Sequence, residues 1–406
     1  MAAAAADLAE KAERELGGSS SIGGGFLLAT SAAGEQGQAV GQYLAECWPE
    51  ADLLGTSFEG ILGEGQVWRD EPALGLFVWE EGADPPLSFV FGQDELAPSR
   101  VAEELLASVD LPELGPEDLV LLFPDATGSP GWPVFLDELR AALGNAQIAG
   151  AAASGFSEGP ALGWSGEEAC PGALTGLLIL GGDRASRDQQ CTGGGLRVAA
   201  ASATREASPW LEITGCRSRW VDELEEEPPL DWVRRQLGLD GRARIEPYLD
   251  RLMARVRRRI PLSDLNGDAH APEADAEEGD ADRGYEEQFL IGLDARRGAI
   301  SLPGVFERGD ELAFALPDAD LARKALRASV DALAESPLIL QFACRARDEN
   351  LHGDRDVESA LVAHHAGARA TLGTLAPFQV GPDTAGETRT LVHSTVLAAL
   401  GDEEDS

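Results

Sequence analysis

Cys344 is the residue of this sequence best placed for nucleophilic chemistry. It ends the apolar run LILQFAC, Arg345 and Arg347 follow it, and His352 lies further along the chain. Cationic neighbours lower the pKa of a thiol and so increase the fraction of reactive thiolate. A cysteine that ends an apolar strand is more commonly a packed small hydrophobe. The sequence therefore favours a structural cysteine and leaves a thiol-dependent enzyme as an alternative.

The histidines and the other cysteines form no metal-binding pattern. His364 and His365 are adjacent, so on a helix their side chains diverge by about 100°. The five cysteines are an odd number without CxxC spacing, which gives neither a zinc signature nor a disulfide framework. His393 or another histidine could be an axial haem ligand, although a CxxCH attachment motif is absent. We expect no cofactor and keep haem as an alternative.

Sequence motifs of common enzymes are also missing. The patterns GxxxxGK[ST] and HExxH do not occur. The glycines at 193–195 precede a predicted strand, whereas a phosphate cradle opens a helix. We therefore predict a binding protein that is not an enzyme.

Three segments resemble one another: LLGTSFEGILG (53–63), QIAGAAASGFS (147–157) and TLGTLAPFQVG (371–381). Each has glycine and small residues where a strand is predicted to end. Ligands of α/β proteins bind at the carboxyl ends of parallel strands, where glycine lets backbone amides approach closely. The alternative is that the glycines only serve tight turns. The predicted ligand-binding residues are Gly55, Thr56, Ser57, Glu59, Gly150, Ser154, Cys344, Arg345, Gly373 and Gln379.

Strands and helices alternate along the chain and would position these residues. Strands are predicted at 25–31, 51–57, 118–125, 146–154, 337–347 and 370–381, with helices at 35–48, 134–143 and 355–368 between them. Strand–helix–strand recurrence predicts parallel pairing with right-handed crossovers. Shorter segments at 173–182, 194–202 and 210–216 suggest antiparallel strands. The expected fold class is α/β, α+β in part, with mixed sheets flanked by helices.

A basic cluster ends the segment 246–259, which is predicted to be a helix. It contains Arg255, Arg257, Arg258 and Arg259. Cations near the carboxyl end of a helix interact favourably with its dipole. We therefore favour a structural role for the cluster over a binding patch.

The overall charge excludes several classes of partner. There are 71 acidic and 32 basic residues, a formal net charge of −39. Such a field repels nucleic acids and anionic membrane surfaces, and no apolar run reaches the roughly 18 residues of a transmembrane helix. Only Lys11 and Lys324 are lysines, which suggests a protein adapted to concentrated salt. The N-terminus lacks a signal-peptide pattern, so we expect a cytoplasmic protein.

Composition also suggests the domain boundaries. We expect an N-terminal helix and flexible linker at 1–24, a first domain at 25–240 and a second at 241–400, followed by an acidic tail at 401–406. The second domain contains an acidic stretch at 263–287 with almost no large apolar residues, which is typical of a disordered insertion.

The order of these segments resembles the FIST domain family. LLGTSFEGILGEG, LLFPDATG and QIAGAAASG are similar to its N-terminal domain. EPYLDRL, FLIGLDARRGAISLPGVFERGDELAFALPDAD, LILQFACRAR and TLGTLAPFQVGP are similar to its C-terminal domain. The resemblance covers residues 25–395 and rests on the order and spacing of these motifs together.

The resemblance implies a sensory module of prokaryotic signal transduction that binds small molecules such as amino acids. Its output would be a separate protein of the kinase, chemoreceptor or nucleotide-cyclase type. One bacterial branch of the family binds haem and senses nitric oxide. The family motif close to GEIGP reads Phe378-Gln379-Val380-Gly381-Pro382 here, so a carboxylate that would pair with a ligand ammonium is replaced by a neutral amide.

Overall fold

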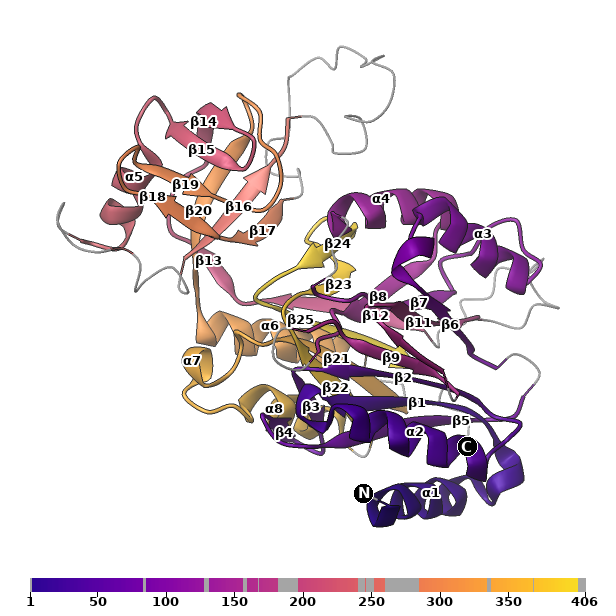
Figure 1. Ribbon diagram of the computed structural model, residues 1–406. Coiled ribbons are helices and arrows are strands. Elements are labelled where there is room, and N and C mark those ends of the chain that lie inside the picture. The colour runs from indigo at the N-terminus through magenta and orange to yellow at the C-terminus, as the bar shows by residue number, and fades with distance from the viewer. Residues whose placement is uncertain are drawn as a thin grey trace.

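The structure is a computed structural model that describes residues 2–82, 85–127, 131–155, 159–166, 168–181, 196–239, 245, 252–259, 285–333, 337–367 and 369–400. It consists of a body of three mixed sheets and a smaller lobe joined to the body by two strands (Figure 1). The predicted mixed α/β fold is confirmed. No helix in these ranges is both long and apolar enough to cross a membrane.

Each sheet of the body is built on one strand–helix–strand unit whose two strands are parallel. The confirmed parallel pairs are those expected from the alternating pattern of the sequence. The first unit is β1 (Ile22–Thr30), α2 (Glu35–Cys47) and β2 (Asp52–Phe58); the second is β7 (Leu119–Phe123), α4 (Trp132–Leu143) and β8 (Gln147–Ala151); the third is β21 (Leu338–Cys344), α8 (Val357–Ala366) and β22 (Ala370–Ala376).

The three units exchange strands in cyclic order. The strand after β2 pairs with β22, the strand after β22 pairs with β8, and the strand after β8 pairs with β2. An antiparallel strand closes the other side of each unit. The exchanged strands are β3 (Gly60–Gly63), β23 (Gln379–Pro382) and β9 (Leu162–Ser165), and the closing strands are β5 (Leu74–Glu80), β11 (Leu174–Ile179) and β25 (Ser394–Leu400). Strands from both expected domains therefore share two of the three sheets.

Edge strands and helices complete the body. Each sheet carries a pair of helices on its outer face, while the inner faces of all three sheets meet in one apolar cluster. The edge strands are β4 (Gln66–Arg69), β6 (Leu87–Phe91), β10 (Glu168–Pro171), β12 (Arg197–Ser202) and β24 (Thr388–Leu391). The remaining helices are α1 (Ala2–Leu16), α3 (Pro98–Ser108), α6 (Ala319–Ala332) and the short α7 (Glu349–His352).

Aromatic rings from all three units form the centre of this cluster. The ring of Phe123 lies 4.7 Å from that of Phe26, 5.6 Å from that of Phe58 and 5.7 Å from that of Phe342, measured between centroids. Stacked and edge-on aromatic pairs add about 0.5–1.5 kcal/mol each beyond the area that they bury. The three sheets are therefore joined by shared apolar packing and not only by strand exchange.

The three glycines of the repeated segments occupy equivalent positions in this arrangement. Gly55, Gly150 and Gly373 each lie inside a strand that is paired on both sides. A β carbon on Gly150 or Gly373 would lie 1.9 or 2.0 Å from the carbonyl oxygen of the residue paired with it on the parallel strand. On Gly55 it would lie 2.2 Å from the ring of Trp164. Close packing within the sheets explains why these positions are glycine.

The lobe is formed by the described residues among 204–317, namely 204–239, 245, 252–259 and 285–317, and has its own apolar core. It stands apart from the body at the upper left of Figure 1, where β13 and β20 connect the two. Its elements are β13 (Thr204–Glu206), β14 (Leu211–Arg217), β15 (Trp220–Leu224), α5 (Pro229–Gln236), β16 (Met253–Arg257), β17 (Glu286–Phe289), β18 (Gly292–Asp294), β19 (Ala299–Ser301) and β20 (Glu311–Pro317). The boundary expected between residues 240 and 241 lies outside the described residues.

Three details differ from the sequence predictions. Met253–Arg257 is a strand between β17 and β20, not a helix; four successive buried residues are typical of a strand covered on both faces. Residues 22–24, expected in a flexible linker, begin β1 because glycine at position 24 leaves room for the ring of Trp79. Glu286–Phe289 is a strand, while the rest of the acidic stretch up to residue 284 and the tail at 401–406 lie outside the described residues.

Candidate functional site

The predicted site residues meet where β2, β8, β21 and β22 end. Ser57 Oγ donates to the carbonyl oxygen of Ser154 at 2.8 Å, and the amide of Ser154 donates to the carbonyl oxygen of Ser57 at 2.8 Å. Arg345 Nη1 lies 2.6 Å from Glu59 Oε1. We call Ser57, Glu59, Ser154, Arg345 and Gln379 the strand-end cluster.

Gln379 connects to this group through the main chain of Ala376. The carbonyl oxygen of Ala376 accepts from the amide of Arg345 at 2.9 Å and from Gln379 Nε2 at 3.3 Å. The loop between β21 and its helix and the first residue of β23 are therefore held at one point. Residues from all three units contribute to the cluster.

Several polar atoms of the cluster are buried without a hydrogen-bond partner among the described residues. They are Glu59 Oε2, Ser154 Oγ and Gln379 Oε1. Buried polar atoms are nearly always hydrogen-bonded to protein, water or ligand. The side chain of Arg345 is 52% exposed, whereas that of Glu59 is 19% exposed. The cluster thus combines unpaired acceptors below the surface with a cation that solvent can reach.

The other predicted site residues lie deeper in the sheets. Thr56 is 1% exposed and Cys344 is fully buried. Burial raises the pKa of the Cys344 thiol, and the opposing effects of Arg345 and Arg347 are smaller. The thiolate needed by a thiol-dependent enzyme is therefore disfavoured, which agrees with the packed structural cysteine that the sequence favours.

Arg69 is a member of the site that the sequence did not predict. Its Nη1 donates to Asp348 Oδ2 at 2.9 Å, and its Nη2 lies 3.9 Å from Glu59 Oε2. It joins the edge strand β4 to the loop after β21, two segments that lie 279 positions apart in the sequence. No local pattern marks such a contact.

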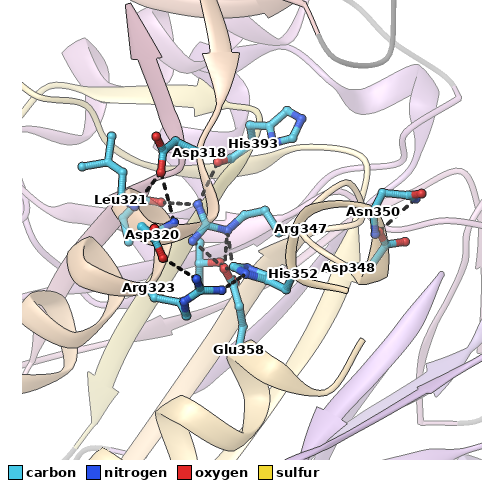
Figure 2. Close-up of polar contacts among 12 residues, drawn as sticks. Asp318, Asp320, Leu321, Arg323, Arg347, Asp348, Asn350, His352, Glu358 and His393 are labelled. Carbon is cyan, nitrogen blue, oxygen red and sulfur yellow. Dashed lines mark hydrogen bonds and ion pairs between the residues drawn. The ribbon is translucent and has the colours of Figure 1, made fainter. Parts of the chain in front are cut away.

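A buried ionic network lies two residues beyond Arg345 (Figure 2). Arg347 is held by the Glu358 carboxylate, with a closest approach of 2.6 Å, and its Nη1 also donates to the carbonyl oxygens of Ala201 at 3.1 Å and His393 at 2.9 Å. His352 Nε2 lies 2.8 Å from Glu358 Oε1. Ala201 belongs to β12, which leads into the lobe, so Arg347 ties the end of β21 to the connection between body and lobe.

The ring of His393 points away from this network in Figure 2. His393 is 2% exposed, has a left-handed backbone with φ of 52°, and has no partner among the described residues for either ring nitrogen. Its ring centroid lies 5.4 Å from that of Phe289 in β17 of the lobe. Burial lowers the pKa of His393 to about 4; the charge of Arg347 adds to this lowering, while those of Glu358 and Asp348 oppose it. The imidazole is therefore neutral at physiological pH.

This lowered pKa predicts a pH dependence of stability. A histidine that is neutral when folded and titrates near 6.5 when unfolded stabilises the fold above pH 6.5, and this contribution is lost as the pH falls toward 4. We expect H393N to reduce this loss by up to about 3 kcal/mol, because asparagine tolerates the left-handed backbone. The loss of stability in each protein is measured by urea unfolding at several pH values between 7 and 4. H364N, at an exposed position, is the control; equal slopes for H393N and the unsubstituted chain would contradict the prediction.

Two of the four histidines that the structure describes are engaged in pairing or packing, which makes them poor axial ligands for haem. Both nitrogens of His352 face partners, Glu358 and Arg323, and His393 packs against Phe289. His364 and His365 are adjacent in the last turn of α8, with ring planes at 90°. Among the described residues, no group of three or more histidines, cysteines or carboxylates could hold a metal ion.

Three cavities lie elsewhere in the described part of the molecule. One of about 80 Å³ lies between the lobe and the body and is lined by Tyr285, Glu287 and Asp383 among others. A second of about 290 Å³ lies within the lobe, and a third of about 660 Å³ lies beside α1 and α2. None of the three is lined by a residue of the strand-end cluster, which Arg345 instead connects to the surface.

Comparison with known proteins identifies the family. The model of the FIST N domain matches residues 25–227, which include the first two units and the strand-end residues Ser57, Glu59 and Ser154. The chain belongs to the FIST family. FIST domains are sensory domains of signal transduction and are not generally enzymatic.

Relatives of this FIST protein cover nearly its whole length. Two uncharacterized proteins of Mycobacterium tuberculosis, from strains CDC 1551 and H37Rv, are each 26% identical to it over 385 residues. The similarity covers 93% of this chain and 91% of each relative. It therefore extends beyond residue 227, although the resemblance of residues 241–400 to a C-terminal FIST domain stays a prediction.

Proposed function

We propose that this FIST protein is a small-molecule sensor that binds a small polar metabolite, such as an amino acid, at the strand-end cluster. The observation that carries the proposal is the set of buried polar atoms that lack a hydrogen bond among the described residues, beside an accessible guanidinium: Glu59 Oε2, Ser154 Oγ and Gln379 Oε1 next to Arg345. A ligand with hydrogen-bond donors would satisfy atoms that the protein leaves unpaired.

The chemistry of the cluster suits a zwitterion. Arg345 can hold a carboxylate with two parallel hydrogen bonds, and Glu59 supplies the carboxylate for an ammonium group. Gln379, which replaces the glutamate of the usual family motif, contributes a neutral acceptor. Without ligand, Arg345 and Glu59 pair with each other at 2.6 Å. Binding would exchange this one ion pair for two, so neither charge would be left unpaired.

The position of Arg345 suggests how binding would be transmitted. A ligand that draws Arg345 away from Glu59 acts on the turn Cys344–Arg347, in which the amide of Arg347 donates to the carbonyl oxygen of Cys344 at 2.9 Å. Arg347 in turn holds Ala201 at the entrance to the lobe. Because a ligand shifts an equilibrium only through different contacts in its two states, this turn is where we expect the states to differ. A separate kinase, chemoreceptor or cyclase would recognise the change.

Thermal-shift measurement with a panel of amino acids and small metabolites tests the proposal. We expect at least one of them, at about 10 mM, to raise the Tm, because a ligand that binds only the folded state stabilises it by mass action. E59Q and R345Q should weaken binding about tenfold or more, which is about 1.4 kcal/mol. R100Q, at an exposed ion pair on α3, is the control. Absence of any shift, or equal binding by all three variants, would refute the proposal.

A further inference from the structure

The arginines that end β16 lack the structural explanation that a helix would provide. The cluster was expected at the carboxyl end of a helix, where a dipole attracts cations. Met253–Arg257 is a strand, and strands have only small net dipoles. Arg255 is accounted for by a buried ion pair with Glu287 at 2.9 Å. Arg257, Arg258 and Arg259 need another reason to lie side by side.

These three arginines line the cavity within the lobe. Its volume is about 290 Å³, and its other lining residues are Glu212, Gly309 and Glu311. We call it the arginine cleft. The Arg259 side chain lies against Gly309 on the opposite wall, at ordinary contact distance from the position of a β carbon there. The left-handed φ of 93° is the reason that glycine suits this position.

Aromatic rings hold two of the guanidinium groups in place. The Arg257 guanidinium lies 3.9 Å from the ring centroid of Trp210, and that of Arg258 lies 5.1 Å from the ring centroid of Phe306. Such cation–π contacts orient a guanidinium and leave its N–H edges free for other acceptors. The two cations are therefore positioned before any ligand arrives.

The carboxylates near these arginines do not saturate them. Arg257 Nη1 is 4.0 Å from Glu311 Oε2, and Arg258 Nη2 is 3.8 Å from Glu286 Oε2. Both distances exceed those of charge-assisted hydrogen bonds. The Nε atoms of Arg257 and Arg258 are buried and lack a hydrogen-bond partner in the described structure. The cleft thus offers positive groups whose hydrogen bonds are incomplete.

We infer that the arginine cleft binds a small oxyanion that carries hydroxyl groups, specifically the phosphate monoester of a sugar or polyol. The guanidinium groups of Arg257 and Arg259 receive the phosphate oxygens, for which planar bidentate donors are well suited. The carboxylates of Glu212 and Glu311 accept from the hydroxyl groups. A bare anion would meet these two carboxylates without compensating donors, so the hydroxyl groups decide which anion is bound.

Isothermal titration calorimetry of the full chain at low salt tests this inference. Glucose 6-phosphate should bind. Inorganic phosphate lacks the sugar hydroxyl groups, glucose lacks the phosphate, and gluconate carries a carboxylate with fewer anionic oxygens in its place. Each of these three should therefore bind at least about tenfold more weakly. Equal binding of glucose 6-phosphate and inorganic phosphate would overturn the role of the hydroxyl groups. No heat of binding with glucose 6-phosphate at about 10 mM would overturn the site itself.

Two variants localise the binding. R259Q should weaken the binding of glucose 6-phosphate at least about tenfold. It should fold normally because the Arg259 side chain is exposed and, within the described part of the chain, the bond found for this residue is that of its backbone amide to Asp310 at 2.9 Å. R217Q is the matched control, because Arg217 is an exposed arginine of the same lobe that pairs with Asp222 outside the cleft. Equal affinity of R259Q and R217Q would refute the inference. The outcome is independent of the strand-end cluster, which E59Q and R345Q test.

Discussion

Gly373→Ala is expected to lower the free energy of unfolding by more than about 3 kcal/mol or to prevent folding. A β carbon at this position would lie 2.0 Å from the carbonyl oxygen of Gln341, in the parallel pair β21–β22 at the middle of a sheet. Main-chain atoms cannot rotate away as a side chain can, so the two strands would have to separate and lose hydrogen bonds. The loss would be measured by urea unfolding.

Two other glycines make this prediction specific. Gly131→Ala should leave stability nearly unchanged, because nothing lies within 4 Å of the position of its β carbon. Gly55→Ala should cost less than Gly373→Ala, because it meets the Trp164 ring at 2.2 Å and a side chain can shift. If Gly373→Ala unfolds at the same urea concentration as Gly131→Ala, then the close packing of β21 and β22 is not required.

Glu358→Gln is expected to destabilise the protein by about 3–5 kcal/mol, because it leaves the buried charge of Arg347 uncompensated. Both side chains are inaccessible, at 0% and 4% exposure. Glu358 also accepts from Thr395 Oγ1 at 2.8 Å and contacts His352 at 2.8 Å. The amide of glutamine keeps the shape but cannot balance the guanidinium charge, so the segments held by Arg347 should loosen together.

The same substitution changes the dependence of stability on pH. Arg347 and the hydrogen bond from His352 lower the pKa of Glu358 to about 2, against the effect of burial, from an ordinary value of 4.5. A carboxylate with a lowered pKa stabilises the fold above pH 4.5, and this contribution is lost as the pH falls from 4.5 to about 2. E358Q should therefore show a smaller loss of stability across that range.

E103Q provides the control for both effects, since Glu103 is an exposed carboxylate on α3. It should leave the urea midpoint at neutral pH and the acid branch of the stability curve unchanged. An E358Q protein as stable as E103Q would mean that Glu358 does not neutralise Arg347 in the folded protein.

Much of the body could be predicted from the sequence because its signals are local. Apolar runs of strand length followed by amphipathic helices indicate parallel pairs, and β1–β2, β7–β8 and β21–β22 are such pairs. The glycine-containing repeats also bring Ser57 to Ser154 and Glu59 to Arg345 at the strand ends, and the use of these strand ends for a ligand stays a prediction.

Local sequence signals were misleading where a strand is buried on both faces, because such a strand does not alternate between apolar and polar residues. Residues 253–257 combine arginines with apolar residues and so suggest an amphipathic helix, but their side chains are covered on both faces of a sheet. The reactivity of Cys344 likewise depends on burial, which a local sequence pattern does not reveal. Cationic neighbours are visible in the sequence, whereas the complete burial that raises its pKa is a property of the packed sheet.

The amino-acid sequence by itself therefore determined the strand–helix–strand units, the negative charge and the residue types at the strand ends. Only the tertiary structure decided how the units exchange β3, β9 and β23 in a cycle, which pairs residues such as Gly63 and Leu372 that lie far apart in the chain. It also decided which charges are buried together, as in Arg347 and Glu358, and which remain incompletely paired, as in the arginine cleft. The physical reason is that periodicity and propensity act over a few neighbouring residues, whereas strand partners and burial depend on the packing of the whole chain.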